Sequence, residues 1–260
     1  MNLIKKIFIN FKSKGLKKTV IKVISQVIDI VLLKRYIKNK LSQEILSQKT
    51  LEERFDKIYT SNYWSDSQSR SGSGSNLEST KNIRYHLPLI IKKFNIKSIF
   101  DAPCGDLNWM SHILKDINID YHGSDIVEKI IVSNNKKFKK NKITFSKKNI
   151  IIDELPNCDL MICRDCLLHF SYNDIFLFLN NFISSNIKYL LTTSNLNEEH
   201  IFTNTNIVTG DFRLLDLFSE PFNLEKKHIY SFDDRDYLEI KNFKQMYLFS
   251  REQLKFSVTK

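Results

Sequence analysis

The chain has 260 residues, 42% of them hydrophobic, which is enough for one sizeable core but not for two large domains. The formal net charge is +11, and residues 1–50 hold 12 Lys and Arg against 2 Asp and Glu, so the rest of the chain is nearly neutral. A neutral body argues against a nucleic-acid enzyme whose whole active face is basic. The charge distribution predicts a basic N-terminal appendage, residues 1–54, on a body formed by residues 55–260.

The appendage alternates Ile, Val, Leu and Phe with Lys at near-helical spacing over residues 1–41, which predicts a pair of basic amphipathic helices. Its longest apolar stretch, 23–33, is interrupted by Ser25, Gln26 and Asp29. The stretch is therefore too short and too polar to span a bilayer, which takes about 20 apolar residues. Two interpretations stay open: the apolar face lies on an anionic membrane surface, or it packs on the body or on a second copy of the chain.

The four cysteines are Cys104, Cys158, Cys163 and Cys166, in a chain with no secretory cleavage pattern. This favours reduced thiols and a cytoplasmic protein, with peripheral contact at the inner membrane face left open by the appendage. The spacing of Cys163, Cys166 and His169 suggests zinc, but no second Cys pair completes a set of four ligands. We therefore expect no metal.

Residues 61–80, "SNYWSDSQSRSGSGSNLEST", are rich in Ser, Gly and Asn and predict a loop. The loop is either a flexible linker or a segment folded over a ligand. Tyr63, Trp64 and Arg70 favour the second interpretation, because pure linkers seldom carry large aromatic side chains.

From residue 81 helices and strands alternate, which predicts parallel βαβ units and a Rossmann-like, doubly wound α/β sheet. We expect helices at 83–95, 108–117, from 127 onward and at 173–185, and strands at 97–102, 120–126, 142–150, 158–164 and 188–194. Ser171 and Asp174 stand in capping-box spacing before the last of these helices. Residues 226–254 predict two strands around an acidic turn, an antiparallel finish to a mostly parallel sheet.

Ligands of such sheets bind beyond the carboxyl ends of the strands. The first predicted strand ends at Asp101 and is followed by Gly105, and the second ends at Asp125, 20 residues after that glycine. This is the spacing at which a carboxylate accepts the ribose hydroxyls of an adenosine held over the first βα turn.

The first turn, "DAPCGD", does not suit a pyrophosphate. It has one glycine, Pro103 lacks an amide hydrogen, and Asp101 and Asp106 repel phosphate. A dinucleotide is disfavoured, and the same acids suit a ligand with cationic groups such as S-adenosylmethionine.

The chain resembles the class I S-adenosylmethionine-dependent methyltransferases in "FDAPCGDLNWM", "GSDI", "CDLMICRDCLLHFS" and "YLLTTS". It is similar, more narrowly, to a bacterial group associated with surface-polysaccharide genes, through "IYTSNYWS", "SRSGSGSN" and "NIVTGDFRLLDLFSEPFNL". The resemblance covers about residues 55–252. One departure is Asn149, where an Asp that contacts adenine is frequent in the wider class.

The resemblance implies a set of positions that bind S-adenosylmethionine. These positions are Gly72, Ser73, Asp101, Cys104, Gly105, Asp125, Ile126, Asn149, Ile150 and Arg164. Asp125 would hold the ribose, Asn149 and Ile150 would lie by the adenine, and Gly72 and Ser73 would cap the methionine end.

Methyl transfer to a hydroxyl needs a base, and the loop after the fourth strand offers His169 or Asp165. Acceptor contacts are expected at Tyr63, Trp64, Asn108, Trp109, Asp211 and Arg213. We expect O-methylation of a saccharide or phosphorylated precursor of a bacterial surface polysaccharide, a capsule phosphate or phosphoramidate group among them, and no nucleic-acid partner. The alternatives are an RNA methyltransferase and a non-catalytic membrane-surface protein that retains the cofactor fold.

Overall fold

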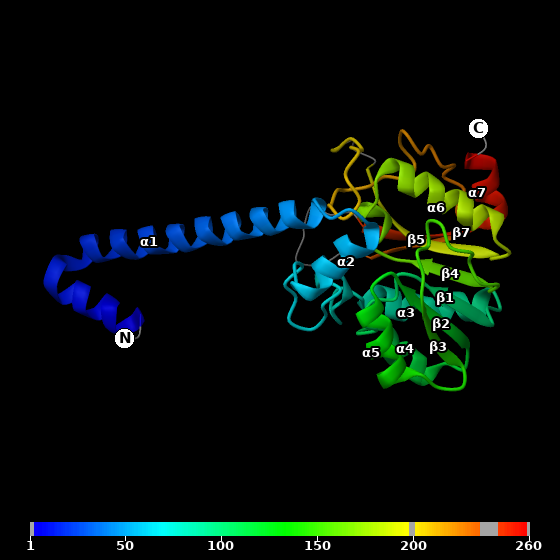
Figure 1. Ribbon diagram of the computed structural model, residues 1–260, viewed down its shortest axis with the longest axis horizontal. Coiled ribbons are helices and arrows are strands. Elements are labelled where there is room, and N and C mark those ends of the chain that lie inside the picture. The colour runs from blue at the N-terminus through cyan, green and yellow to red at the C-terminus, as the bar shows by residue number, and fades with distance from the viewer. Residues whose placement is uncertain (1–2, 198–200, 235–243, 259–260) are drawn as a thin grey trace. The chain divides into compact units, whose positions relative to one another are not determined.

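The computed structural model describes residues 3–197, 201–234 and 244–258 (Figure 1). The chain divides into two compact units, Met1–Ser47 and Gln48–Lys260. The predicted boundary after residue 54 lies inside the second unit, because residues 50–53 begin a helix of that unit. Thr50 and Glu53 form a capping box in which the Thr50 hydroxyl accepts from the Glu53 N–H at 3.2 Å.

The first unit is a single helix, α1 (Leu3–Leu46), where the sequence predicts a pair. Gly15, the residue at which a break would be cheapest, is helical like its neighbours. No helix in the described part of the chain is long and apolar enough to cross a membrane.

The second unit is an α/β sandwich around a seven-stranded sheet of order β3-β2-β1-β4-β5-β7-β6. Its helices are α2 (Leu51–Thr60), α3 (Lys81–Lys93), α4 (Met110–Asp116), α5 (Glu128–Phe138), α6 (Tyr172–Ser184) and α7 (Arg251–Val258), with short 3-10 turns η1 (Ser73–Ser75) and η2 (Leu167–His169). Its strands are β1 (Ser98–Asp101), β2 (Asp120–Asp125), β3 (Ile143–Lys147), β4 (Leu160–Cys163), β5 (Tyr189–Asn195), β6 (Tyr230–Asp233) and β7 (Lys244–Ser250).

The sheet has the predicted topology. Strands β1 to β5 pair in parallel, and β7 runs antiparallel to both β5 and β6. The predicted fold class is confirmed. The end of the chain differs in one respect, because α7 begins at Arg251, directly after β7, where the sequence predicts only the end of a strand. The predicted acidic turn falls on residues 235–243, outside the described residues.

Helices cover both faces of the sheet (Figure 1). Alternate residues of the central strands point into two separate hydrophobic cores. Phe100 and Met161 pack with the buried side of α6, whereas their neighbours Ile99 and Leu160 pack with α3 and α4. This period of two, on strands that are buried on both faces, is the pattern of a sheet covered by helices on each side.

The start of α6 fixes the loop after β4. The Ser171 hydroxyl accepts from the Asp174 N–H at 3.2 Å, so the predicted N-cap is present. The Asp174 carboxylate accepts from the Thr209 hydroxyl, and the Ser171 N–H donates to that hydroxyl at 2.7 Å. The segment around Thr209 is thereby fastened to the same helix start.

Candidate active site

A cavity opens at the carboxyl ends of β1, β2 and β4, where the strand order reverses between β1 and β4. Its walls come from the turns after these strands, from α2 and from the 61–80 loop. Lining residues named by the sequence are Trp64, Asp101, Cys104, Gly105, Trp109, Asp125, Ile126, Asn149, Ile150, Arg164, Asp165 and His169. The structure therefore brings together most of the predicted cofactor positions and both candidate bases.

Gly105 shapes the first turn through a contact with the 61–80 loop. Its φ is +54°, and a Cβ at this position would overlap the Ser71 hydroxyl. The Gly105 N–H donates to Asp125 Oδ2 at 3.2 Å, and Asn134 Nδ2 donates to the Gly105 carbonyl at 2.8 Å. The glycine is required by the close approach of the loop as well as by the turn itself.

Asp125 stands at the end of β2 with its carboxylate at the cavity. It is buried and accepts backbone hydrogen bonds from Gly105 and, at 3.0 Å, from Val127. Burial raises the pKa of Asp125 to about 6, although these hydrogen bonds act in the opposite direction. The predicted spacing of 20 residues therefore corresponds to a direct bond between the glycine turn and the acid.

Asp101 is a second buried carboxylate at the same cavity. It accepts from the Tyr121 hydroxyl at 2.7 Å, and burial raises its pKa to about 7. Within the described residues, neither Asp101 nor Asp125 forms an ion pair. Two buried acids without a cation of their own fit a ligand that brings positive charge, and they oppose a phosphate.

The cavity lining also has apolar members. Ile126 and Ile150 are among them. Asn149 lies beside them and uses its Oδ1 to accept from the Ile151 N–H at 3.1 Å. Cys104 also faces this space, and burial raises the pKa of its thiol well above the usual range, so it acts as a small apolar residue.

The 61–80 loop is folded over the site and fastened at three places. The Asp106 carboxylate accepts from Ser69 Oγ at 2.9 Å, and Asn108 Nδ2 donates to the Ser75 carbonyl at 2.9 Å. Arg164 Nη1 donates to the Gly74 carbonyl at 2.6 Å. These bonds decide against the linker interpretation. Ser71 and Ser75 line the cavity, whereas Gly72 and Ser73, the predicted cap of the methionine end, lie beside this lining.

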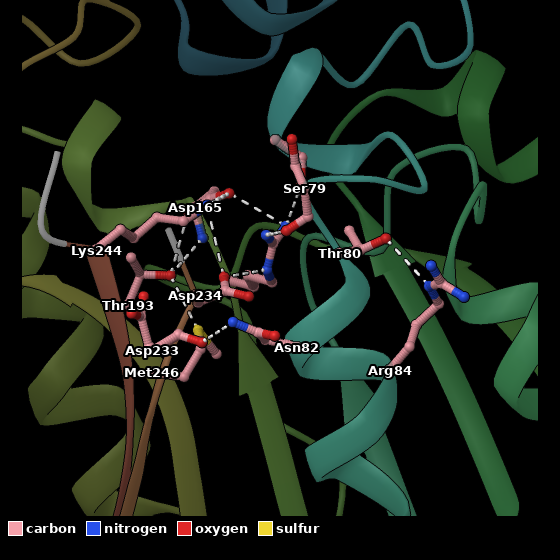
Figure 2. Close-up of polar contacts among 12 residues, drawn as sticks. Ser79, Thr80, Asn82, Arg84, Asp165, Thr193, Asp233, Asp234, Lys244 and Met246 are labelled. Carbon is pink, nitrogen blue, oxygen red and sulfur yellow. Dashed lines mark hydrogen bonds and ion pairs between the residues drawn. The ribbon is translucent and has the colours of Figure 1, made fainter. Parts of the chain in front are cut away.

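Arg164 forms a network of four charged side chains that the sequence did not predict. The other three are Asp165, Asp234 and Lys244 (Figure 2). The Arg164 Nε donates to Asp234 Oδ2 at 2.8 Å, and its Nη1 lies 3.1 Å from Asp165 Oδ2. Lys244 Nζ lies 2.8 Å from Asp165 Oδ2 and 3.5 Å from Asp234 Oδ2. The network joins the loop after β4 to the ends of β6 and β7. The Arg164 donors are thereby occupied by acceptors of the protein itself, the Asp234 carboxylate and the Gly74 and Ser79 carbonyls.

Asp165 is a weak base in this setting. Burial alone would raise its pKa, but Arg164 and Lys244 more than offset burial and hold the pKa at about 2. Its φ is +51°, and its N–H donates to Thr193 Oγ1 at 2.9 Å. Gly74 packs so closely on it that a Cβ there would come within 2.6 Å of Asp165 Oδ2. Asp165 therefore holds the loop and the turn in place.

His169 ends η2 and lines the cavity. Its Nδ1 lies 2.7 Å from the Asp211 carbonyl, an acceptor, so Nδ1 carries the proton and Nε2 is left as the basic nitrogen. Burial lowers the pKa of His169, which keeps the ring neutral near pH 7. Trp64 packs on the ring at a centroid distance of 5.3 Å, and Phe212 packs on it at 5.8 Å.

Four predicted acceptor residues lie outside the cavity lining: Tyr63, Asn108, Asp211 and Arg213. Arg213 is buried under η2, where its Nη1 donates to the Leu168 carbonyl at 3.0 Å, and burial lowers its pKa to about 10. In this position it supports the turn that carries His169.

Sequence reasoning missed three residues of α2 that line the cavity, Leu51, Phe55 and Tyr59. Their spacing of four residues, one helical face, was a visible signal. The signal was missed because the predicted boundary after residue 54 assigned the first turn of this helix to the appendage.

Two solved structures of similar fold are S-adenosylmethionine-dependent methyltransferases. Magnesium protoporphyrin IX methyltransferase from Synechocystis, with bound S-adenosylmethionine, has a TM-score of 0.55 and 12% identity over 79% of this chain and 99% of that chain. An S-adenosylmethionine-dependent methyltransferase from Leishmania major has a TM-score of 0.55 and 10% identity over 81% of this chain and 90% of that chain.

No protein-family model and no curated protein matches the sequence. At these identities the likeness shows the fold: a Rossmann-like methyltransferase fold with an antiparallel C-terminal strand. Among the described residues, no group of three or more His, Cys, Asp or Glu is placed to hold a metal ion.

Proposed function

We propose that this protein is an S-adenosylmethionine-dependent methyltransferase that methylates a hydroxyl of a small polar acceptor. The observation that carries the proposal is that Asp125 and the neutral His169 line one cavity at the switch point of the sheet. The bound cofactor in similar structures supports the choice of ligand. The acceptor class, a saccharide or phosphorylated precursor of a bacterial surface polysaccharide, rests on the sequence resemblance.

The residues present fit this cofactor. Asp125 would accept the ribose hydroxyls, Ile126 and Ile150 would flank the adenine, and the negative charge of Asp101 would favour the ammonium and sulfonium groups. When bound, S-adenosylmethionine supplies a methyl group on a positively charged sulfur, which makes that carbon an electrophile.

His169 would take the proton of the acceptor hydroxyl on Nε2 as the oxygen attacks. The Asp211 carbonyl holds the ring in the required tautomer, and its bond with the Nδ1 proton strengthens as the ring becomes positively charged. Trp64 and Trp109 provide flat apolar walls, which suit the C–H face of a sugar ring. The folded loop excludes water and aligns the acceptor with the methyl group.

Calorimetry with S-adenosylmethionine tests the cofactor. We expect binding by the full chain, weakened about 10- to 100-fold by Asp125→Ala through loss of charge-assisted hydrogen bonds. Asp120→Ala is the matched control, because Asp120 begins the same strand on the exposed side. Equal binding by the two variants, or no binding by the full chain, contradicts the cofactor assignment.

Turnover tests the acceptor. Release of S-adenosylhomocysteine is measured with nucleotide-linked sugars and phosphorylated capsule precursors as acceptors, with RNA as the competing class. We expect turnover with the first group that His169→Gln reduces and that RNA does not support. Turnover with RNA alone would replace this acceptor class by the RNA methyltransferase alternative.

A further inference from the structure

The first unit carries a concentration of exposed apolar side chains. Eleven large apolar residues of α1 between Val20 and Ile37 are 46% to 66% exposed. They are Val20, Ile21, Ile24, Val27, Ile28, Ile30, Val31, Leu32, Leu33, Tyr36 and Ile37. Soluble monomers rarely leave so many neighbouring apolar side chains in water, so this segment is expected to have an occupant.

The apolar residues from Val20 to Leu32 share one side of the helix. At 100° per residue they cover an arc of about 200°, whereas Ser25, Gln26 and Asp29 occupy the remaining side. Beyond Leu32 the pattern changes, because Leu33, Tyr36 and Ile37 lie on that remaining side. The apolar arc is about 20 Å long at 1.5 Å per residue. A wide, short apolar arc on a long helix is the geometry of a helix that lies in the plane of a membrane interface.

The charges next to this arc are basic. Lys34, Arg35 and Lys38 follow within two turns and project from the side of the helix on which the arc lies, and all three are exposed. Residues 1–50 as a whole hold 12 Lys and Arg against 2 Asp and Glu. Basic residues near an anionic lipid surface are attracted to it, so the charge complements such a surface.

A second copy of the chain fits this surface less well. A helix pair would need an apolar seam at alternating spacings of three and four residues, and the seam that runs from Val20 to Val31 next reaches Lys34 and Lys38. Two copies would bring these lysines together in the seam. At a membrane the same lysines extend toward the lipid phosphates while their alkyl stems stay in contact with apolar surface.

We propose that α1 binds anionic membranes, with the Val20–Leu32 arc inserted among the lipid headgroups and the basic residues that follow paired with lipid phosphates. The inference rests on α1 alone and is independent of the methyltransferase assignment. It gives the protein a peripheral membrane location.

Flotation of the full chain with vesicles tests the proposal. The vesicles are phosphatidylcholine alone or phosphatidylcholine with 30% phosphatidylglycerol. We expect recovery with the anionic vesicles, and weaker recovery at 0.5 M salt because salt screens the lysines. Absence of recovery with anionic vesicles overturns the proposal.

Two double variants locate the contact on the helix. Val27→Glu with Val31→Glu changes the centre of the apolar arc, and Ser25→Glu with Gln26→Glu makes the same charge change on the opposite side. Recovery should be lost in the first variant and retained in the second, with far-UV circular dichroism and thermal unfolding as the check that both are folded. Equal recovery of both variants contradicts insertion of the apolar arc. A concentration-dependent dimer in light scattering without vesicle recovery contradicts membrane binding and favours a second copy.

Discussion

The ionised carboxylate of Asp101 destabilises the free protein at neutral pH, so Asp101→Asn is expected to raise its free energy of unfolding. The side chain is 2% exposed, and burial raises its pKa to about 7 from an ordinary value of 3.8. In the window between these values the folded state holds a proton that the unfolded state releases. Stability therefore falls as pH rises from about 4 to 7 and is flat above that range.

The magnitude follows from the shift. A displacement of about three pKa units corresponds to about 4 kcal/mol lost by pH 8, of which about 3 kcal/mol is lost between pH 5 and pH 8. Asparagine cannot ionise, and its amide oxygen can accept the Tyr121 hydroxyl bond in place of the carboxylate. The advantage of the variant over the parent protein should grow by up to about 3 kcal/mol over that pH range.

Urea denaturation of the free protein at pH 5, 6, 7 and 8 measures this difference, with exposed Asp116→Asn as the control. The same asparagine variant should bind S-adenosylmethionine at least about tenfold more weakly at pH 8, because it cannot supply the negative charge. A stability difference that does not change with pH would refute the assignment of Asp101 as a strained, buried acid. Unchanged affinity would refute its role toward the cationic ligand.

Three further results are expected. Affinity for S-adenosylmethionine should rise by about three orders of magnitude from pH 5 to pH 8, because both Asp101 and Asp125 must lose protons. Calorimetry in buffers of different ionisation enthalpy should detect the release of these protons. His169→Gln should lower kcat about 10²- to 10⁴-fold and remove the acidic limb of the pH profile of kcat, while the cofactor Kd changes little. An acidic limb that persists in the kcat profile of the variant excludes His169 as the base. Asp234→Asn should lower the free energy of unfolding by about 3 kcal/mol, because Arg164 loses a buried charged partner. It should also raise the cofactor KM, because the 61–80 loop is held less firmly. Asp234→Glu should restore part of the stability and part of the cofactor KM.

Local patterns in the sequence were sufficient for the architecture. Apolar runs of strand length alternate with helical periodicity over residues 81–194, and that alternation requires parallel strands with helices on both faces. The N-cap at Ser171 and the spacing between Gly105 and Asp125 were also readable, because each involves residues that the chain brings together within one turn or one βαβ unit.

Other features depend on contacts between distant segments. Lys244 and Asp165 are in contact but 79 residues apart in the sequence, and Arg164 and Asp234 are 70 residues apart. A local sequence pattern therefore cannot predict their ion pairs. The same contacts hold the pKa of Asp165 at about 2, which makes Asp165 too weak a base to be the alternative candidate to His169.

The sequence by itself determined the sheet and the gathering of the predicted cofactor positions at the strand ends, since these follow from periodicity and from the residues of one turn; the cationic character of the ligand stays a prediction. Only the tertiary structure decided that the 61–80 loop covers the cavity, that α2 forms one of its walls, and that Asp165 is held by two cations whereas the His169 ring stays neutral. These properties depend on burial and on which charges meet in space, and both are set when the chain closes on itself.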